Sequence, residues 1–139
     1  MKTNALITLA IVQWQDGEKS ETELLTRANV TGQDNNYVIS YEDTEATGFY
    51  GCVTTIKIEG SKCASIIRKG TANSVLYLEK DRKHFCQYET PYGSLQVGIR
   101  TSELKNTIDK DGKLYLKYTL DLNSSYLSDN EIIMTIKND

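Results

Sequence analysis

The stretch that decides the fold is Leu114-Tyr115-Leu116-Lys117-Tyr118-Thr119-Leu120-Asp121-Leu122, in which every even position carries a large apolar side chain. Alternation with a period of two places one face of a strand in a core and the other face in water. Short segments of strand character, each ended by turn-forming residues, fill the chain from Ala5 to Lys137. Because open strand edges promote aggregation, a chain of this kind is expected to close on itself or to stack two sheets.

The expected strands are separated by turn signals such as Asp16-Gly17 and Gly60-Ser61, since Gly and Asp tolerate positive φ. Most connections have hairpin length, which favours strands that pair with their neighbours in the chain. The sequence therefore predicts an all-β fold: a single domain over residues 1–139, built as an antiparallel meander barrel of about 8–10 strands. The predicted strands are Ala5–Gln15, Glu21–Gly32, Asn36–Thr44, Phe49–Glu59, Lys62–Lys69, Asn73–Lys80, Lys83–Glu89, Ser94–Ser102, Lys113–Asn123 and Asn130–Lys137.

The register of the strands predicts which side chains face the core. A two-residue turn pairs Leu78 with Phe85, and the next connection, taken as five residues long, pairs Phe85 with Ile99. This register turns two polar side chains inward, those of Gln87 and Glu89. They are the first indication of a function other than packing.

A second register prediction concerns the end of the chain. A five-residue loop from Ser124 to Ser128 pairs Leu120 with Ile132. The long gap before this pair of strands, from Glu103 to Asp111, has room for one short helical turn with Ser102 as its N-cap. The side chains expected in the core are those of Leu116, Tyr118, Leu120 and Met134.

Composition excludes several classes of function. The 139 residues are 39% hydrophobic and 25% charged with a net charge of −3, which is typical of a soluble domain and argues against a nucleic-acid partner. The apolar run from Ala5 to Val12 is shorter than the ~18 residues of a membrane helix, so we expect a buried strand and no membrane partner. Cys52, Cys63 and Cys86 lack paired spacing and are expected to be free thiols in the cytoplasm.

No catalytic or metal-binding motif stands out. The single histidine, His84, is expected to contact Glu79 across the strand pair on the outer face, too far from Cys86 for a nucleophilic dyad. The run Glu42-Asp43-Thr44-Glu45 lacks the glycine of a calcium loop and is interpreted as a solvated strand end. We therefore expect no metal, no cofactor and no enzymatic activity.

Several segments of the chain resemble a known protein family. They are Tyr37-Val38-Ile39-Ser40-Tyr41-Glu42-Asp43, Thr47-Gly48, Thr54-Thr55-Ile56-Lys57, Ile67-Arg68-Lys69-Gly70, Tyr88-Glu89-Thr90-Pro91-Tyr92-Gly93-Ser94-Leu95 and Gly98-Ile99-Arg100-Thr101. Over nearly its whole length the chain is similar to the YwiB-like family of small bacterial proteins of unknown function. The resemblance implies a calycin-like barrel, the architecture of lipocalins and fatty-acid-binding proteins, and by analogy a small ligand.

The candidate ligand residues include two arginines that lie within strands and are flanked by apolar residues, Arg68 and Arg100. A guanidinium presents a rigid fork that matches the two oxygens of a carboxylate, and tyrosine hydroxyls add hydrogen bonds. The alternative is that both arginines lie along the outer surface of the barrel. Parity favours the outer face for Arg100, because Val97 and Ile99 take the other one.

The proposed rim of the site is the turn Glu89-Thr90-Pro91-Tyr92-Gly93, which proline and glycine make rigid. Glu89 would face the barrel mouth and pair with Arg68, or with Arg100 as second choice, while Tyr41 and Tyr92 donate hydrogen bonds. The same pair would serve equally well as an ion pair that plugs the barrel end. The ligand-binding set is thus Tyr41, Arg68, Gln87, Glu89, Tyr92 and Arg100.

Three functions remain open at this stage. The leading one is a non-catalytic barrel that binds a small apolar or carboxylate-bearing molecule at one mouth. The second is an interaction or housekeeping scaffold with a filled core, and the weakest is an esterase-like or isomerase enzyme using Glu89 with a tyrosine. An interior cavity of about 300 Å³ or more would favour the first over the second. The oligomeric state is left open.

Overall fold

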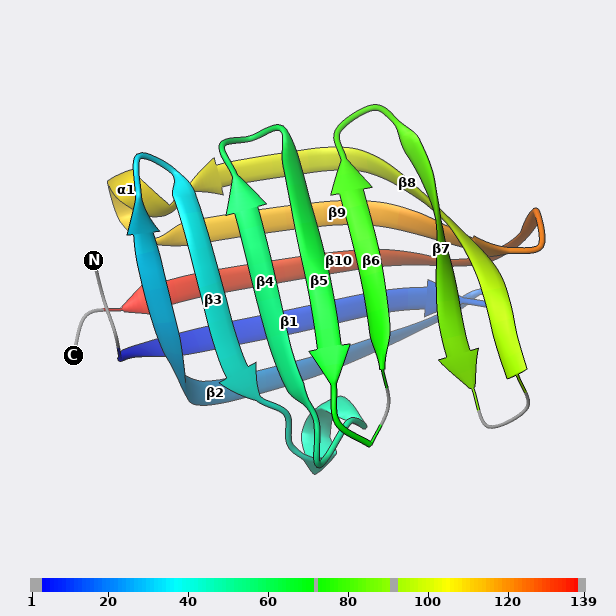
Figure 1. The fold of residues 1–139 in the computed structure, drawn as a ribbon, viewed down its shortest axis with the longest axis horizontal. Coiled ribbons are helices and arrows are strands. Elements are labelled where there is room, and N and C mark those ends of the chain that lie inside the picture. Colours follow the sequence, from blue (N-terminus) through cyan, green and yellow to red (C-terminus); the bar gives the residue numbers. More distant parts are fainter. Residues whose placement is uncertain (1–3, 72, 91–92, 138–139) are drawn as a thin grey trace.

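The computed structural model describes residues 4–71, 73–90 and 93–137, with the backbone alone for residues 88–90. It is a closed barrel in which each strand pairs antiparallel with the next along the chain and the last pairs with the first (Figure 1). The predicted all-β antiparallel meander barrel is confirmed. The strands are β1 (Ala5–Gln15), β2 (Glu18–Gln33), β3 (Asn36–Glu42), β4 (Val53–Glu59), β5 (Cys63–Lys69), β6 (Ser74–Glu79), β7 (Lys83–Thr90), β8 (Gly93–Thr107), β9 (Lys113–Leu122) and β10 (Ser125–Lys137).

The core lies between two groups of strands that cross at a steep angle. Figure 1 shows β3, β4, β5 and β6 running across β1, β10, β9 and β8 behind them. Alternation in β9 works as predicted, since Leu114 and Leu116 are fully buried and Lys117 is exposed. The other fully buried large side chains are Ile7, Val30, Ile39, Ile56, Ile58, Leu78, Ile99, Leu104 and Met134.

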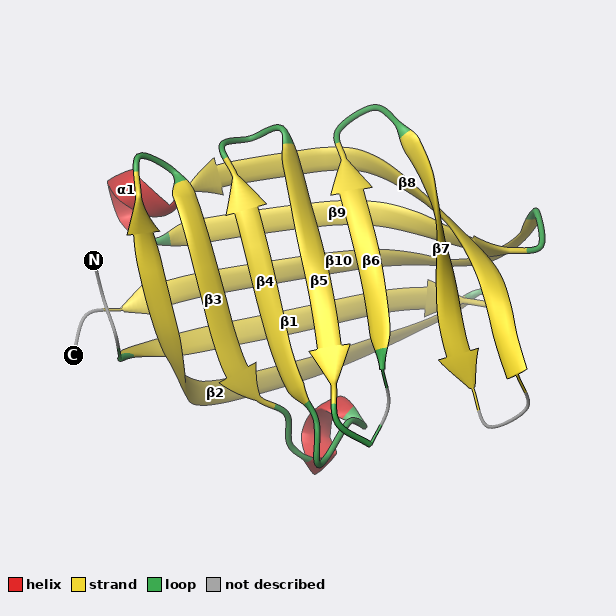
Figure 2. Cartoon of the chain, viewed as in Figure 1, coloured by secondary structure: helices red, strands yellow, loops and turns green. Residues whose placement is uncertain are grey.

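Two short helical segments lie at opposite ends of the strands β3–β5, namely η1 (Glu45–Thr47) and α1 (Ile108–Asp111) (Figure 2). The α1 end is closed by hydrogen bonds of the side chains of Asn106 and Asp109. The side-chain amide of Asn106 donates to the carbonyl oxygens of Asn35 and Gly60, both at 2.8 Å. The carboxylate of Asp109 accepts hydrogen bonds from the backbone N–H of Asn35 and from the hydroxyl of Tyr37. These contacts leave the η1 end as the candidate mouth.

The predicted pairing of β9 with β10 is wrong by four residues. Ile132 lies opposite Leu116 instead of Leu120, because β9 and β10 are joined by a two-residue turn, Asn123 and Ser124, followed by a bulge in β10 between Tyr126 and Ser128. A shift by an even number leaves every side chain on its predicted face. Leu116, Tyr118 and Met134 are buried as expected, whereas Leu120 is only partly buried against the core.

The predicted register of β7 is wrong by one residue, which matters more. His84 pairs with Ile99 and Cys86 pairs with Val97, because Thr90 already pairs with Gly93 and the connection is shorter than expected. A shift by one residue exchanges the two faces of a strand. Phe85 is therefore 58% exposed and Gln87 is exposed, and Cys86 packs against the core in their place.

The gap predicted after Ser102 is part of a strand. Strand β8 continues to Thr107, with a bulge between Thr101 and Glu103, because its second half pairs with the first half of β9. The helical turn expected there follows at Ile108–Asp111, so Ser102 is not its N-cap.

As expected, no disulfide joins the three cysteines. Cys52 and Cys63 are buried and Cys86 is half-buried. In the part of the chain that the structure describes, the longest helix is far too short to cross a membrane.

Candidate functional site

The barrel contains a cavity of about 280 Å³ beside η1. This volume lies just below the range for small-molecule sites, roughly 300–1,000 Å³. Among the described residues that line the cavity, Arg68 is alone in carrying a charge, and no lining residue is a histidine, cysteine or carboxylate. The apolar part of the wall is formed by Ile11, Ile56, Ile66, Leu76, Leu120 and Ile132.

Arg68 reaches the cavity because of its place in β5. Ile66, two residues earlier on the same strand, is buried, so Arg68 lies on the inner face. Its neighbours across β4 and β6 are Thr54 and Ser74, and Thr54 pairs in turn with Tyr41 of β3. One polar row therefore crosses four strands at the mouth, above the layer that contains Ile66.

The guanidinium of Arg68 is held on one side only. Its Nε donates a hydrogen bond to Oγ1 of Thr54 at 3.1 Å and lies 3.7 Å from Oδ2 of Asp43. The ring of Phe49 stacks on it, with the ring centre 3.7 Å from Cζ. Neither Nη has a hydrogen-bond partner among the described residues, although the side chain is only 13% exposed. Two donors of a desolvated cation thus remain available to a ligand.

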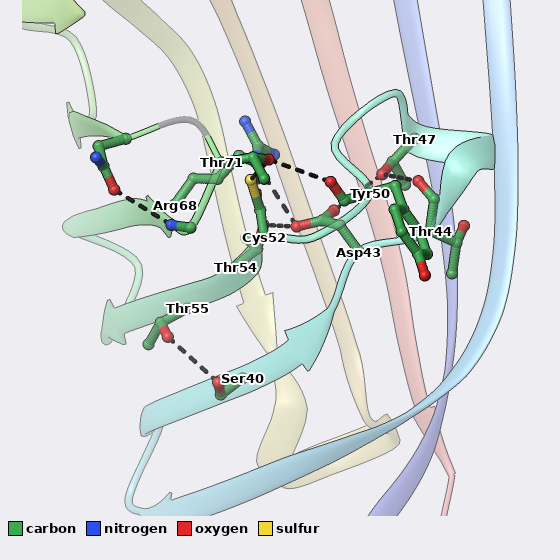
Figure 3. A network of polar contacts seen from close by, with 12 residues as sticks. Ser40, Asp43, Thr44, Thr47, Tyr50, Cys52, Thr54, Thr55, Arg68 and Thr71 are labelled. Carbon is green, nitrogen blue, oxygen red and sulfur yellow. Dashed lines mark hydrogen bonds and ion pairs between the residues drawn. The ribbon is translucent and has the colours of Figure 1, made fainter.

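Asp43 is the carboxylate that balances this cation, and its side chain is fully buried. Oδ2 accepts a hydrogen bond from the hydroxyl of Thr54 at 2.5 Å, and Oδ1 accepts one from the hydroxyl of Thr47 at 3.0 Å (Figure 3). Both carboxylate oxygens are therefore occupied. A buried ion pair with satisfied oxygens is tolerated, whereas either partner alone would carry a large desolvation cost.

Two tyrosines add neutral hydroxyls to the same space, Tyr41 from β3 and Tyr118 from β9. Burial raises the pKa of each to about 12, and for Tyr41 the charge of Asp43 acts in the same direction. The positive charge of Arg68 opposes the rise in both pKa values. Both hydroxyls therefore stay protonated near neutral pH and can donate hydrogen bonds.

The segment between β3 and β4 covers this mouth and holds Asp43 in place. The backbone N–H of Asp43 donates to the carbonyl oxygen of Cys52 at 2.9 Å, which closes the segment into a compact loop. The loop packs closely on Gly70, whose φ is +139°. A Cβ built on Gly70 would lie 2.3 Å from the carbonyl oxygen of Gly51.

We expect Gly70→Ala to lower the free energy of unfolding by about 1–3 kcal/mol, because alanine resists this φ and its methyl group would push the loop away. Urea unfolding followed by tryptophan fluorescence measures the loss. Gly17→Ala is the control, since Gly17 also has positive φ, +76°, but has open space around its Cβ position. Equal losses in the two variants would show that the loop does not depend on the close contact.

Both the sequence and the fold of this chain are similar to those of known proteins. A family model described as a domain of unknown function, DUF1934, matches residues 7–134. The chain belongs to the DUF1934 family. The crystal structure of the ywiB protein from Bacillus subtilis resembles this DUF1934 barrel with a TM-score of 0.75 and 16% sequence identity, over 99% of this chain and 94% of that one. At this identity the likeness shows the fold, and it confirms the YwiB-like resemblance of the sequence. No curated protein sequence matches the chain.

In this DUF1934 barrel the predicted ligand residues do not all meet. Arg68 and Tyr41 line the cavity together. Gln87 is exposed because of the register shift in β7, and Arg100 is exposed on β8, on the outer face that parity favoured. The side chain of Glu89 and the whole of Tyr92 lie outside the described residues, so the proposed rim stays a prediction.

The remaining chemistry of the DUF1934 chain lies away from the cavity. His84 contacts Glu79 as predicted, with 2.8 Å between Nε2 and Oε1, and its ring meets that of Tyr77 edge-on. Among the described residues, no three His, Cys, Asp or Glu side chains are placed to hold a metal ion.

Sequence reasoning missed Asp43, which is buried and not solvated as predicted. The period-two pattern of the strand could have placed Asp43 in the interior, because Ile39, Tyr41 and Asp43 occupy alternate positions and share the inner face. Acidic neighbours on both sides, Glu42 and Glu45, concealed it. The stacking of Phe49 on Arg68 had no local signal, since Phe49 lies in the connection between β3 and β4 and Arg68 lies in strand β5 of this DUF1934 fold.

Proposed function

We propose that this DUF1934 barrel binds a small, partly apolar molecule in the cavity beside η1 and performs no chemistry on it. The observation that carries the proposal is an interior cavity of about 280 Å³ whose wall combines aliphatic side chains with one buried cation, Arg68. The rest of the wall carries neutral polar side chains, those of Gln13, Ser20, Thr22, Thr47 and Asn130, so the cavity offers both apolar contacts and hydrogen bonds to a small molecule. A wall without histidine, cysteine or carboxylate among its described residues supports binding without catalysis.

The alternative function is a scaffold whose barrel interior is completely filled by its own side chains. The far half of the barrel fits that description, since Ile7, Leu78 and Met134 are fully buried. The η1 half does not, because Leu76 and Leu120 there are only partly buried and border the open space. Free thiols support a reducing location such as the cytoplasm.

Native mass spectrometry of the protein purified from its own host tests the proposal. We expect a retained small molecule, and we expect isothermal titration calorimetry to detect binding of the neutral probe 1-octanol. Leu120→Trp should remove both signals, because the indole would fill the cavity that Leu120 borders.

The matched control is Leu25→Trp, since Leu25 is 64% exposed on the outer face of β2 and should tolerate the same substitution without effect. Absence of both a retained molecule and octanol binding in the unmodified protein would favour the filled-core scaffold. Loss of binding in the Leu25 variant would place the site on the outer surface instead.

A further inference from the structure

We infer that the ligand of this barrel is a carboxylic acid with a single negative charge, and that Arg68 and Tyr118 hold its head group while Asp43 limits the charge that the site accepts. The inference rests on the proposed function. It adds the chemical class of the ligand and the orientation in which it binds.

The first observation is a tyrosine hydroxyl that faces the cavity and has no partner in the described part of the protein. Tyr118 is 7% exposed and lines the cavity, and among the described residues none forms a hydrogen bond with its hydroxyl group. The hydroxyl is accessible from the cavity, so a molecule bound there can form the hydrogen bond that these residues do not supply. Asn130, the neighbour of Tyr118 on β10, directs its side-chain N–H groups to Ser128.

The second observation is the kind of group that faces the cavity near Arg68. Both Nη atoms of Arg68 are pure donors, and the hydroxyl of Tyr118, protonated near neutral pH, donates as well. The one carboxylate nearby, Asp43, has both oxygens occupied by threonine hydroxyls. A head group that only accepts hydrogen bonds fits this arrangement, and an ionised carboxylate is such a group. A cationic head group would be repelled by the positive charge of the guanidinium across the same cavity.

The third observation is the charge balance. Arg68 and Asp43 already form a neutral pair, with 3.7 Å between Nε and Oδ2. One ligand carboxylate shares the guanidinium with Asp43, but a second negative charge would have no cation among the described lining residues. Since an unpaired charge in a desolvated site is strongly unfavourable, a doubly charged phosphate monoester should be rejected.

The apolar wall sets the orientation. Ile56 and Ile66 lie two residues along β4 and β5 from Thr54 and Arg68, one layer deeper on the same inner face. Leu120 lies two residues along β9 from Tyr118. The acid therefore lies at the polar row near η1, and its hydrocarbon part contacts the aliphatic side chains around it.

Calorimetric titration with three probes of equal chain length tests the inference: octanoate, 1-octanol and octyl phosphate. We expect octanoate to bind at least about tenfold more tightly than octanol, because a hydrogen bond to a charged group contributes that much. Octyl phosphate should bind more weakly than octanoate. If octanol binds and octanoate shows no advantage, the inference is wrong while the proposed function stands. If no probe binds, the proposed function itself fails.

Two substitutions assign the residues. Tyr118→Phe should weaken octanoate binding about tenfold and leave octanol binding unchanged, since only the hydroxyl is removed. Tyr115→Phe is the control, because Tyr115 is on the other face of the same strand, where its hydroxyl contacts Glu131. Equal weakening of octanoate and octanol by Tyr118→Phe would show a packing role and overturn the assignment.

Asp43→Asn tests the charge limit. Removing the competing carboxylate should tighten binding of octanoate about tenfold and of octyl phosphate by at least as much. Unchanged or weaker binding of both acids would show that Asp43 does not restrict ligand charge. Octanol binding reports whether the cavity of this variant is intact.

Discussion

Replacement of Arg68 by methionine should destabilise the barrel by about 3–5 kcal/mol, because it leaves a fully buried carboxylate without its cation. Asp43 has no access to solvent, and its two threonine partners supply hydrogen bonds but no charge. Urea denaturation at neutral pH measures the loss.

The double variant Asp43→Asn and Arg68→Met is the control for this result. It removes both charges at similar side-chain volume and should recover most of the lost stability, because neutral replacement of a buried pair is often harmless. A double variant as unstable as the single one would show that the guanidinium contributes by packing against Phe49 and not by balancing charge.

Leu116→Ala should lower the free energy of unfolding by about 2–5 kcal/mol, whereas Leu120→Ala should cost clearly less. Leu116 is fully buried between β8 and β10, so its truncation leaves a new void in a close-packed core. Leu120 borders a cavity that already exists, and its truncation only enlarges that cavity.

The same two variants distinguish an effect on stability from an effect on ligand affinity. Leu120→Ala should alter affinity for octanol with little loss of stability, and Leu116→Ala should do the reverse. Chemical denaturation and calorimetric titration of both proteins provide the comparison. Equal destabilisation would mean that Leu120 is packed as tightly as Leu116, which would contradict the cavity.

Much of the fold could be predicted from local patterns. The bounds of β1 and the inner face of β9 follow from alternation and turn residues, because these signals need only neighbouring positions. The pairing error in β10 was harmless to this prediction, since Leu116 keeps its face after a shift of four residues. The error in β7 was harmful, since a shift of one residue moved Gln87 from the cavity to solvent.

The candidate site was predictable only in part. Arg68 and Tyr41 were named because an arginine between apolar residues and a tyrosine in a strand are suited to an anion. The sequence left the face of Arg68 open, and it assigned the partner role to Glu89 instead of Asp43. Nothing local indicates that Tyr118 lacks a hydrogen-bond partner, because that depends on which side chains surround it in the folded barrel.

By itself, then, the sequence determined an antiparallel barrel of short strands and the apolar face of most of them, because burial of one face requires a period of two in the residues. Only the tertiary structure decided that Asp43, Thr54 and Arg68 meet beneath η1. Their meeting depends on the turn lengths that set cross-strand register, and on a loop that closes over Gly70. A shift of one residue in any of these pairings would turn the buried cation outward, so the site depends on register while the fold class does not.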